Sequence, residues 1–315
     1  MRLPLGMTYP QPTKSSPQPA PRRRPVGPLD DTDPGVHRGV LAADVPHVDV
    51  RGARIPALGF GTWQMTGAEC ARAVEDALEL GYRHIDTARM YENEAAVGRA
   101  LTASGLPRDA IFLASKIWWE RADADGVRAS VHAMIRDLSV DHLDLCYLHW
   151  PNPDVPLRET LEAMRALQEE GAIRHLGVSN FTPTLLDEAL RIAPITALQV
   201  EYHPFLAQDD LRRLCQRHEL ALVAYSPLAR GNVHGHPRLK AIGERHGKSP
   251  EQVTLRWLTQ QHHVAAIPKA SSRAHRAANL AIFDFELSAE EAQAISELAR
   301  GERIIDPSFA PEWEQ

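Results

Sequence analysis

The stretch Leu143-Asp144-Leu145-Cys146-Tyr147-Leu148-His149-Trp150 carries the pattern on which the fold prediction rests: a short apolar segment that runs directly into a reactive side chain. Similar apolar segments recur along the chain at the spacing of a βα unit, about thirty residues. They begin near Leu58, His84, Ile111, His175, Leu198, Leu220 and Val264. The intervening stretches have helical periodicity. We therefore predict an α/β protein built as a (β/α)8 TIM barrel.

Most of the predicted strands end in a polar side chain. These side chains are Asp86, Lys116, His149, Asn180, Gln199, Tyr225 and Lys269. In a TIM barrel the carboxyl ends of the strands meet at one rim, which carries the active site. The alternative of an open doubly wound sheet is disfavoured, because no GxGxxG motif follows the first strand. We expect the polar groups to surround one mouth.

Flanking elements can be predicted with less detail. A β-hairpin is expected before the barrel, from strands at 47–50 and 55–58 around the turn Arg51-Gly52-Ala53. Helices are expected over 68–80, 127–138, 161–168 and 250–260. The last would have Ser249 as its N-cap and Pro250 at its first position.

The first 45 residues differ in composition from the rest. They contain nine prolines and a single aromatic residue, Tyr9, and no apolar period develops. Such a segment cannot bury enough surface to offset its ordering entropy. We predict two regions: residues 1–45 as a disordered tail and residues 46–315 as the barrel domain.

Bulk composition excludes several partners. The net charge of −6 gives no electrostatic basis for binding nucleic acid or anionic membranes. No apolar run reaches the roughly 18 residues needed to span a bilayer. The three cysteines lack metal-binding or CxxC spacing, as expected of reduced thiols in the cytoplasm. His234 and His236 lack a third ligand, so no metal site is expected.

Four residues form a candidate catalytic set: Asp86, Tyr91, Lys116 and His149. An ammonium beside a carboxylate on the inner wall makes a buried pair. A phenol placed against that pair is expected to have a lowered pKa and to serve as a proton donor near neutrality. His149 would orient a substrate oxygen. A purely structural ion pair between Asp86 and Lys116 is the simpler alternative.

The chain resembles the aldo-keto reductase superfamily, whose catalytic Asp, Tyr, Lys and His match these four residues. The similarity begins near Val48 and includes the segments 58–63, 177–181, 199–204, 224–228 and 267–269. The resemblance implies NADPH-dependent reduction of aldehyde and ketone carbonyls, with Tyr91 as general acid. Within the superfamily it is similar to the prokaryotic branch that includes 2,5-diketogluconate reductases. Small aldehydes, keto esters and keto sugar acids are the implied substrates.

The resemblance also implies where the cofactor lies. Tyr225 would stack on the nicotinamide, Ser179, Asn180 and Gln199 would hold its carboxamide, and Lys269 would face the 2′-phosphate. Further expected contacts are Gly61, Thr62, Trp63, Asp86, Ser226, Leu228, Ile267, Ser271, Ser272, Arg276 and Asn279. Two positions depart from the pattern of NADPH-preferring members: Ala270 replaces a serine and His275 replaces an arginine. Arg273 or Arg276 is expected to compensate.

The expected substrate pocket is aromatic. It would be lined by Trp63, Tyr91, Trp118, His149 and Trp150, and the C-terminal segment 303–307 would close it. For Trp119, packing and pocket roles are equally compatible with the sequence. The expected partner is a small carbonyl compound, and the protein is expected to be a monomer.

Two other functions fit the same sequence. An NADPH-binding regulatory subunit would bind the cofactor without significant turnover. A lyase would use Lys116 as a Schiff-base nucleophile. Steady NADPH oxidation with an aldehyde separates the first from a reductase, and borohydride trapping reveals the second.

Deleting residues 1–45 is expected to change neither turnover nor fold, because their composition offers no core. Thermal unfolding of the truncated and full-length chains checks this. A melting temperature lowered by more than about 4 °C, roughly 1 kcal/mol for a domain of this size, would show that the tail packs on the barrel.

Overall fold

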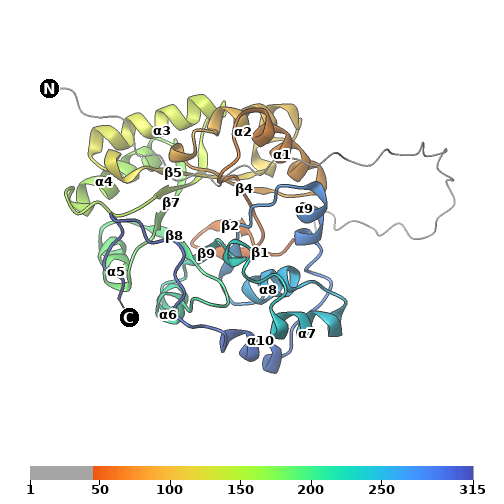
Figure 1. Ribbon diagram of the computed structural model, residues 1–315. Helices are drawn as coiled ribbons and strands as arrows, with labels where there is room; N and C mark the ends of the chain where they lie inside the picture. Colours follow the sequence, from red (N-terminus) through yellow and green to blue (C-terminus); the bar gives the residue numbers. More distant parts are fainter. Residues whose placement is uncertain (1–44, 315) are drawn as a thin grey trace, which may run out of the picture. The chain divides into compact units, whose positions relative to one another are not determined.

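The computed structural model describes residues 45–314. Eight parallel strands form one sheet in the order β10-β9-β8-β7-β6-β5-β4-β3, so each strand lies beside its neighbour in sequence (Figure 1). The strands are β3 Phe60–Gly61, β4 His84–Asp86, β5 Phe112–Ile117, β6 Leu143–Leu148, β7 Ile173–Ser179, β8 Ile195–Glu201, β9 Ala221–Tyr225 and β10 Val264–Ala266.

Backbone contacts between the first and last strands close the sheet. Leu58, just before β3, makes a parallel bridge with Ala266 in β10. The amide of Ala266 donates to Ala57 O at 2.9 Å, and the amide of Gly59 donates to Ala266 O at 2.8 Å. Closure removes both sheet edges. The predicted (β/α)8 barrel is confirmed.

Helices alternate with the strands and surround them (Figure 1). They are α1 Gly67–Leu80, α2 Glu94–Ala103, α3 Ala124–Leu138, α4 Leu157–Glu169, α5 Pro183–Ile192, α6 Asp209–Arg217, α7 Pro237–His246, α8 Pro250–Thr259, α9 Arg273–Leu280 and α10 Ala289–Ser296. The predicted start of α8 is correct, because Ser249 and Gln252 form a capping box. The predicted α3 and α4 begin three to four residues later than the observed helices, whose polar first turns lack the apolar period.

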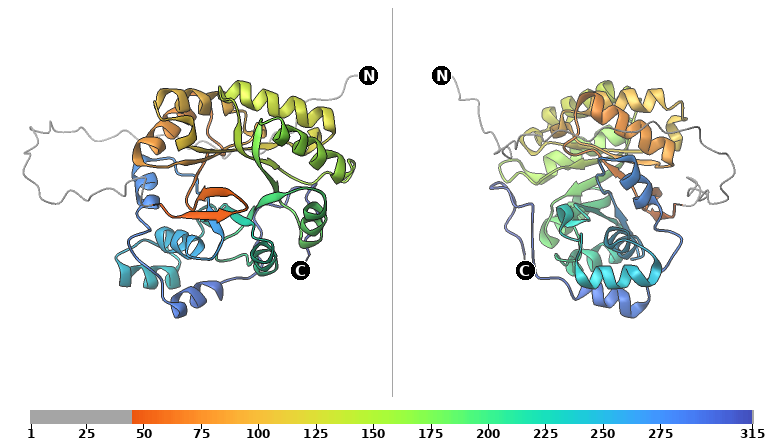
Figure 2. Two further views of the ribbon diagram at one scale, coloured as in Figure 1. Left: turned by 180° about the vertical axis from the view of Figure 1, so that it is seen from behind. Right: turned by 45° about the vertical axis from the view of Figure 1, so that its right-hand side comes forward.

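The N-terminal hairpin exists, but its second strand differs from the prediction. Strand β1, His47–Val50, pairs with β2, Ala53–Pro56, and not with 55–58. Arg51 and Gly52 both have positive φ angles, 45° and 81°, which allows a two-residue turn. Leu58 is thereby released to pair with β10. The hairpin lies across one end of the barrel (Figure 2, left).

Two hydrophobic clusters form the core. One lies between the sheet and the helices and is the larger. The other fills the barrel interior and includes Val48 and Ile55 of the hairpin, which therefore plugs that end. The polar mouth must lie at the opposite end. The predicted tail, residues 1–45, falls outside the described residues except for Val45. No helix within 45–314 is long and apolar enough to cross a membrane.

Candidate active site

The four candidate catalytic residues meet at the carboxyl ends of neighbouring strands. Asp86 ends β4, Lys116 lies in β5 and His149 directly follows β6, while Tyr91 ends the 3-10 turn Arg89–Tyr91 after β4. Lys116 Nζ donates to Asp86 Oδ1 at 2.5 Å and to Thr87 O at 2.8 Å, and it lies 3.5 Å from the Tyr91 hydroxyl oxygen. The sequence-predicted constellation is therefore assembled in space.

A buried asparagine holds the loop that carries Tyr91. Thr87 Oγ1 donates to Asn93 Oδ1 at 2.7 Å, and Asn93 Nδ2 donates to the carbonyls of Thr62 and Met65 at 2.9 and 3.0 Å. One amide thus joins the loops after β3 and β4. Asn93 carries no local sequence signal for this role other than its place two residues after Tyr91, so the sequence alone does not reveal it.

Burial dominates the electrostatics of the pair. It lowers the pKa of Lys116, and the Asp86 carboxylate opposes that effect. Burial and then the Asp86 charge raise the pKa of Tyr91 well above its usual value. The expected lowering of the Tyr91 pKa by Lys116 is therefore not observed. The physical reason is that exclusion of water disfavours the phenolate and the Asp86 carboxylate adds to this effect, while the Lys116 ammonium is already paired with Asp86. Tyr91 is held in its protonated form.

His149 is held neutral between aromatic rings. Burial and the Lys116 charge lower its pKa well below the usual value. Its ring centroid lies 5.8 Å from that of Tyr91 and 5.4 Å from that of Trp118, both edge-on. Its Nδ1 atom has no partner within residues 45–314. A neutral imidazole beside the phenol can orient a polar oxygen without repelling Lys116.

An aromatic wall borders the four residues. Trp63 lies 4.7 Å from Tyr91 between ring centroids and is 38% exposed. Phe309 in the C-terminal segment contacts three tryptophan rings: Trp118, Trp119 and Trp150, at 5.5, 5.1 and 5.5 Å. Trp119 stacks on Phe309, which favours the packing role. Trp150 is only 4% exposed, so Trp63 and Trp118 are the more accessible of the predicted substrate contacts.

The C-terminal segment is anchored by a buried carboxylate. The backbone amides of Ile304 and Ile305 donate to the two oxygens of Glu201, each at 2.8 Å. His203 Nε2 lies 2.9 Å from Glu201 Oε1, and Glu201 is completely buried. Charge-assisted hydrogen bonds of this kind are stronger than neutral ones. The segment that brings Phe309 to the tryptophans is thereby fixed to strand β8.

The residues expected at the nicotinamide lie together beside the catalytic set. Tyr225 donates to Asn180 Oδ1 at 2.7 Å, and Asn180 Nδ2 donates to His149 O at 2.9 Å and to Ser179 Oγ at 3.1 Å. Gln199 Nε2 donates to Asp86 Oδ2 at 2.8 Å. The tyrosine, asparagine and glutamine are thus joined to the catalytic residues by hydrogen bonds.

The other expected cofactor contacts line the rim from β3 to β10. A Cβ at Gly61 would come within 2.8 Å of Ile267 O, so only glycine permits this close approach. Thr62 Oγ1 donates to Asp86 O at 3.1 Å. Ser226 has a positive φ of 46°, and Leu228 is partly buried against the core.

The cationic end of the rim differs from the expectation. Lys269 is exposed and donates to Ser271 Oγ at 2.8 Å, and Ser272 caps α9. Arg276 is buried, with Nε 2.6 Å from Asp76 Oδ2 and Nη1 2.9 Å from Ala270 O. Arg273 also pairs with Asp76 and with Glu79. Asn279, the last predicted contact, is buried at 4% exposure.

Acidic residues of α1 therefore engage both arginines that were expected to compensate for His275. Asp76 lies about two hundred positions away in sequence, and its helix-surface pattern gives no sign of this pairing. Lys269 remains the cation of this region that is not held by a carboxylate among the described residues.

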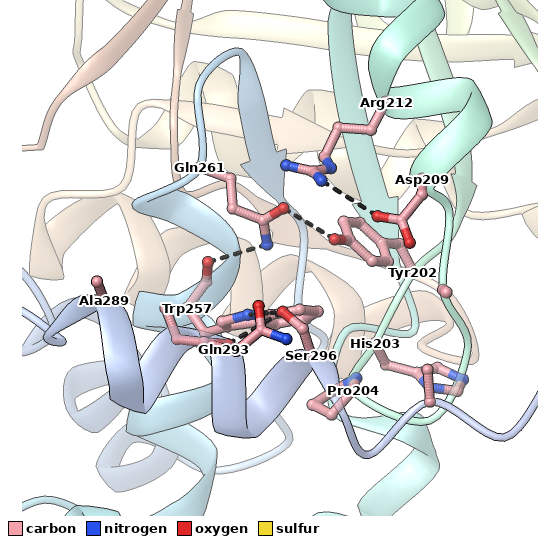
Figure 3. A pocket seen from close by; sticks show the side chains of 13 residues that line it. Tyr202, His203, Pro204, Asp209, Arg212, Trp257, Gln261, Ala289, Gln293 and Ser296 are labelled. Atoms are coloured by element: carbon pink, nitrogen blue, oxygen red, sulfur yellow. Dashed lines mark hydrogen bonds and ion pairs between the residues drawn. The ribbon is translucent and has the colours of Figure 1, made fainter.

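A separate hollow of about 250 Å³ lies away from these residues (Figure 3). It is bordered by the loop after β8 and by α6, α8 and α10. Tyr202 donates to Gln261 Oε1 there at 2.8 Å, and Trp257 forms part of the wall. None of the sequence-predicted site residues lines it. Residues 45–314 contain no group of three or more His, Cys, Asp or Glu suited to a metal ion.

Comparisons with known proteins agree with this geometry. The model of the aldo/keto reductase family matches residues 57–300. An aldo-keto reductase of Mycolicibacterium smegmatis is 41% identical over 257 residues, which cover 80% of this chain and 93% of the relative. The glyoxal reductase of Bacillus subtilis is 39% identical, with 80% and 92% covered. The chain therefore belongs to the aldo/keto reductase family, and the resemblance inferred from its motifs is confirmed.

Solved structures agree as well. A protein provisionally described as a 2,5-diketo-D-gluconic acid reductase B superposes with a TM-score of 0.85 at 46% identity, covering 86% of this chain and 98% of that one. An aldo-keto reductase crystallised with NADPH gives 0.80 at 30% identity, with 86% and 92% covered. Members of the family are NAD(P)H-dependent oxidoreductases that act on carbonyl groups, and this chain is such an enzyme.

The buried histidines predict a pH-dependent stability. The pKa of His149 lies well below its usual value, and that of His84 is also lowered. In the unfolded chain both would titrate near about 6.5. Below that pH the unfolded state binds more protons, so stability falls as pH falls, by up to about 1.4 kcal/mol per pH unit for each histidine.

Urea unfolding between pH 7.5 and 5.5 measures this slope. In the variant His149→Gln this slope should be smaller by about 1.4 kcal/mol per pH unit, which is the contribution of one bound proton. A free energy of unfolding independent of pH in this window would contradict the assignment of two neutral buried histidines.

Proposed function

We propose that this protein reduces aldehyde and ketone carbonyls to alcohols with NADPH, and that Tyr91 is the general acid. The observation that carries the proposal is the juxtaposition of Tyr91, Lys116 and Asp86, with 2.5 Å between the charged partners and 3.5 Å to the phenol. The three stand beside a neutral His149 at an aromatic mouth. This set supplies one proton at a defined point.

Each residue has a distinct part in the proposed reaction. Tyr91 holds a proton and donates it to the substrate oxygen. His149 hydrogen-bonds the same oxygen and fixes the carbonyl orientation. Lys116, held in place by Asp86, stabilises the phenolate left on Tyr91. The bound cofactor supplies the hydride that the carbonyl carbon accepts. Positioned donors of this kind contribute to rate because they need no rearrangement during reaction.

The residues fit a dinucleotide across the rim. Tyr225 presents a partly exposed ring at the end of β9, suited to stacking, and Gly61 leaves room for a close backbone approach. The carboxamide would exchange hydrogen bonds with Asn180 and Gln199. The exposed ammonium of Lys269, with Ser271 and Ser272 beside it, suits the 2′-phosphate.

Small dicarbonyls and keto sugar acids are the substrates we favour, with keto esters as a further group. One relative is a glyoxal reductase, and one structural neighbour bears the diketogluconate reductase description. Trp63 beside Tyr91 and Phe309 beside Trp118 give this mouth an apolar wall, against which the carbon skeleton of a small carbonyl compound can pack. A panel of these carbonyls, assayed with NADPH and with NADH, tests the proposal directly.

Tyr91→Phe is expected to lower turnover by about 10² to 10⁴, the usual contribution of positioned proton transfer. NADPH affinity should change little, because only the hydroxyl is removed. Steady-state NADPH oxidation and fluorescence titration measure the two quantities. Tyr202→Phe removes a buried hydroxyl from the separate hollow and serves as the matched control. Retention of more than half the turnover in Tyr91→Phe would exclude its role as acid.

Lys269→Ala is expected to weaken NADPH binding by roughly tenfold to a hundredfold, because a charge-assisted contact contributes about 1.5–3 kcal/mol. NADH affinity should change little, since NADH lacks the 2′-phosphate. Tryptophan fluorescence titration with both cofactors gives the dissociation constants, and the preference should shrink as salt rises. Lys240→Ala, at another exposed lysine, is the control. Equal losses for NADPH and NADH would refute phosphate recognition by Lys269.

A further inference from the structure

The barrel interior below the catalytic residues is filled by one large side chain among small ones. Tyr147 of β6 points into the inner cluster and is completely buried. Around it the other strands supply Ala114, Ala197, Val223 and Ala265. A single tyrosine therefore occupies the volume that several larger side chains fill in an ordinary barrel layer.

Strand register fixes the place of this ring. Tyr147 pairs with Lys116 on one side and with Gly177 on the other. A Cβ at Gly177 would lie 2.4 and 2.6 Å from Cδ1 and Cε1 of Tyr147, so no larger residue fits there. Glycine on β7 thus makes room for the ring, which lies in the layer of Lys116.

Packing of the ring does not explain why residue 147 carries a hydroxyl group. It is buried and makes no hydrogen bond to any residue of 45–314. Burying such a group without a partner disfavours folding, whereas phenylalanine would fill the same volume without that penalty. A hydroxyl at this position therefore needs a reason other than stability.

The hydrogen bond between Gln199 of β8 and Asp86 of β4 crosses the barrel interior into which Tyr147 points. The Asp86 carboxylate accepts from Lys116 on Oδ1 and from Gln199 on Oδ2. Burial and then the Asp86 charge raise the pKa of Tyr147 well above its usual value, and the Gln199 amide opposes that rise. The hydroxyl thus lies within the electrostatic reach of both members of the Asp86–Gln199 pair.

We propose that Tyr147 is a positioning residue, whose hydroxyl supports the Asp86–Gln199 pair from inside the barrel and keeps Lys116 available to Tyr91. The inference rests on the proposed function, in which Tyr91 is the acid. Tyr147 itself touches neither substrate nor reacting atoms. Without the Tyr147 hydroxyl, the Asp86 carboxylate has one polar neighbour fewer and attracts the Lys116 proton more strongly. Lys116 then stabilises the Tyr91 phenolate less, and Tyr91 becomes a weaker acid.

Other titratable groups act on Tyr91 or on its partner Lys116, and the substitution leaves them in place. Besides Lys116 of β5 itself, they are Asp86 from β4, Glu94 from α2, Cys146 from β6, His149 after β6 and Tyr225 from β9. A change in the titration of Tyr91 on removal of the Tyr147 hydroxyl must therefore pass through one of these groups, and Asp86 is the one whose charge acts on Tyr147.

The decisive variant is Tyr147→Phe, compared with Tyr202→Phe, which removes the hydroxyl that donates to Gln261 in the separate hollow (Figure 3). Tyr147→Phe should lower kcat for a chemistry-limited carbonyl by roughly three- to tenfold, below the full value of an acid catalyst. The alkaline limb of the pH–kcat profile should move upward by about half a pH unit. NADPH affinity should stay within twofold and the melting temperature should not fall.

These readouts separate positioning from a structural role. The inference would be overturned if Tyr147→Phe and Tyr202→Phe lowered the melting temperature equally. An unchanged pH–kcat profile in Tyr147→Phe would also overturn it. Should Tyr147→Phe fold poorly, Tyr147→Leu also lacks the hydroxyl and must move the alkaline limb the same way. Combining Tyr147→Phe with Gln199→Leu should give less than the sum of the two single effects, because both act on Asp86.

A spectroscopic titration distinguishes this inference from the proposed function. The ultraviolet phenolate signal of Tyr91 is the difference between the wild type and Tyr91→Phe. The difference between Tyr147→Phe and the double variant Tyr91→Phe/Tyr147→Phe gives the Tyr91 titration in the absence of the Tyr147 hydroxyl. An upward shift supports the inference even if no carbonyl is reduced, whereas coincident titrations refute it even in an active enzyme.

Discussion

The buried ion pair of Lys116 and Asp86 is the interaction on which the rest of the site depends. Two charges removed from water destabilise the fold unless each keeps close partners. Here the ammonium has Asp86 and the carbonyl of Thr87, and the carboxylate has Lys116 and Gln199. These partners come from β4, from its neighbour β5 and from β8, which reaches Asp86 across the barrel interior. The pair therefore ties these three strands together next to Tyr91.

The mouth around this pair is completed by segments remote in sequence. Asn93 joins the loops after β3 and β4, and Glu201 holds the backbone of the C-terminal segment through Ile304 and Ile305. In both cases a buried polar group satisfies several donors or acceptors at once. Phe309 is thereby brought against the tryptophan rings beside the candidate catalytic residues. The barrel supplies those residues, and the chain that follows it supplies part of the aromatic wall.

The opposite end of the rim shows how neighbouring charges limit recognition. Arg273 and Arg276 would both suit a phosphate, but Asp76 on α1 engages them. Their engagement ties α9 to α1 and leaves Lys269 as the exposed cation of the loop. At this end of the rim the positive charge open to a ligand therefore comes from Lys269, with hydroxyl groups beside it. An arginine in the sequence is not equivalent to an available charge.

The sequence by itself determined the barrel and the gathering of the candidate catalytic side chains at one mouth, because apolar period, turn residues and strand-end side chains are local signals. It placed Asp86, Lys116 and His149 at adjacent strand ends from spacing alone. Tertiary structure decided the hairpin register, the pairing of Asp76 with Arg276, the role of Phe309 and the raised pKa of Tyr91. Each depends on distances between residues far apart in sequence or on exclusion of water, and neither quantity is encoded in a local pattern.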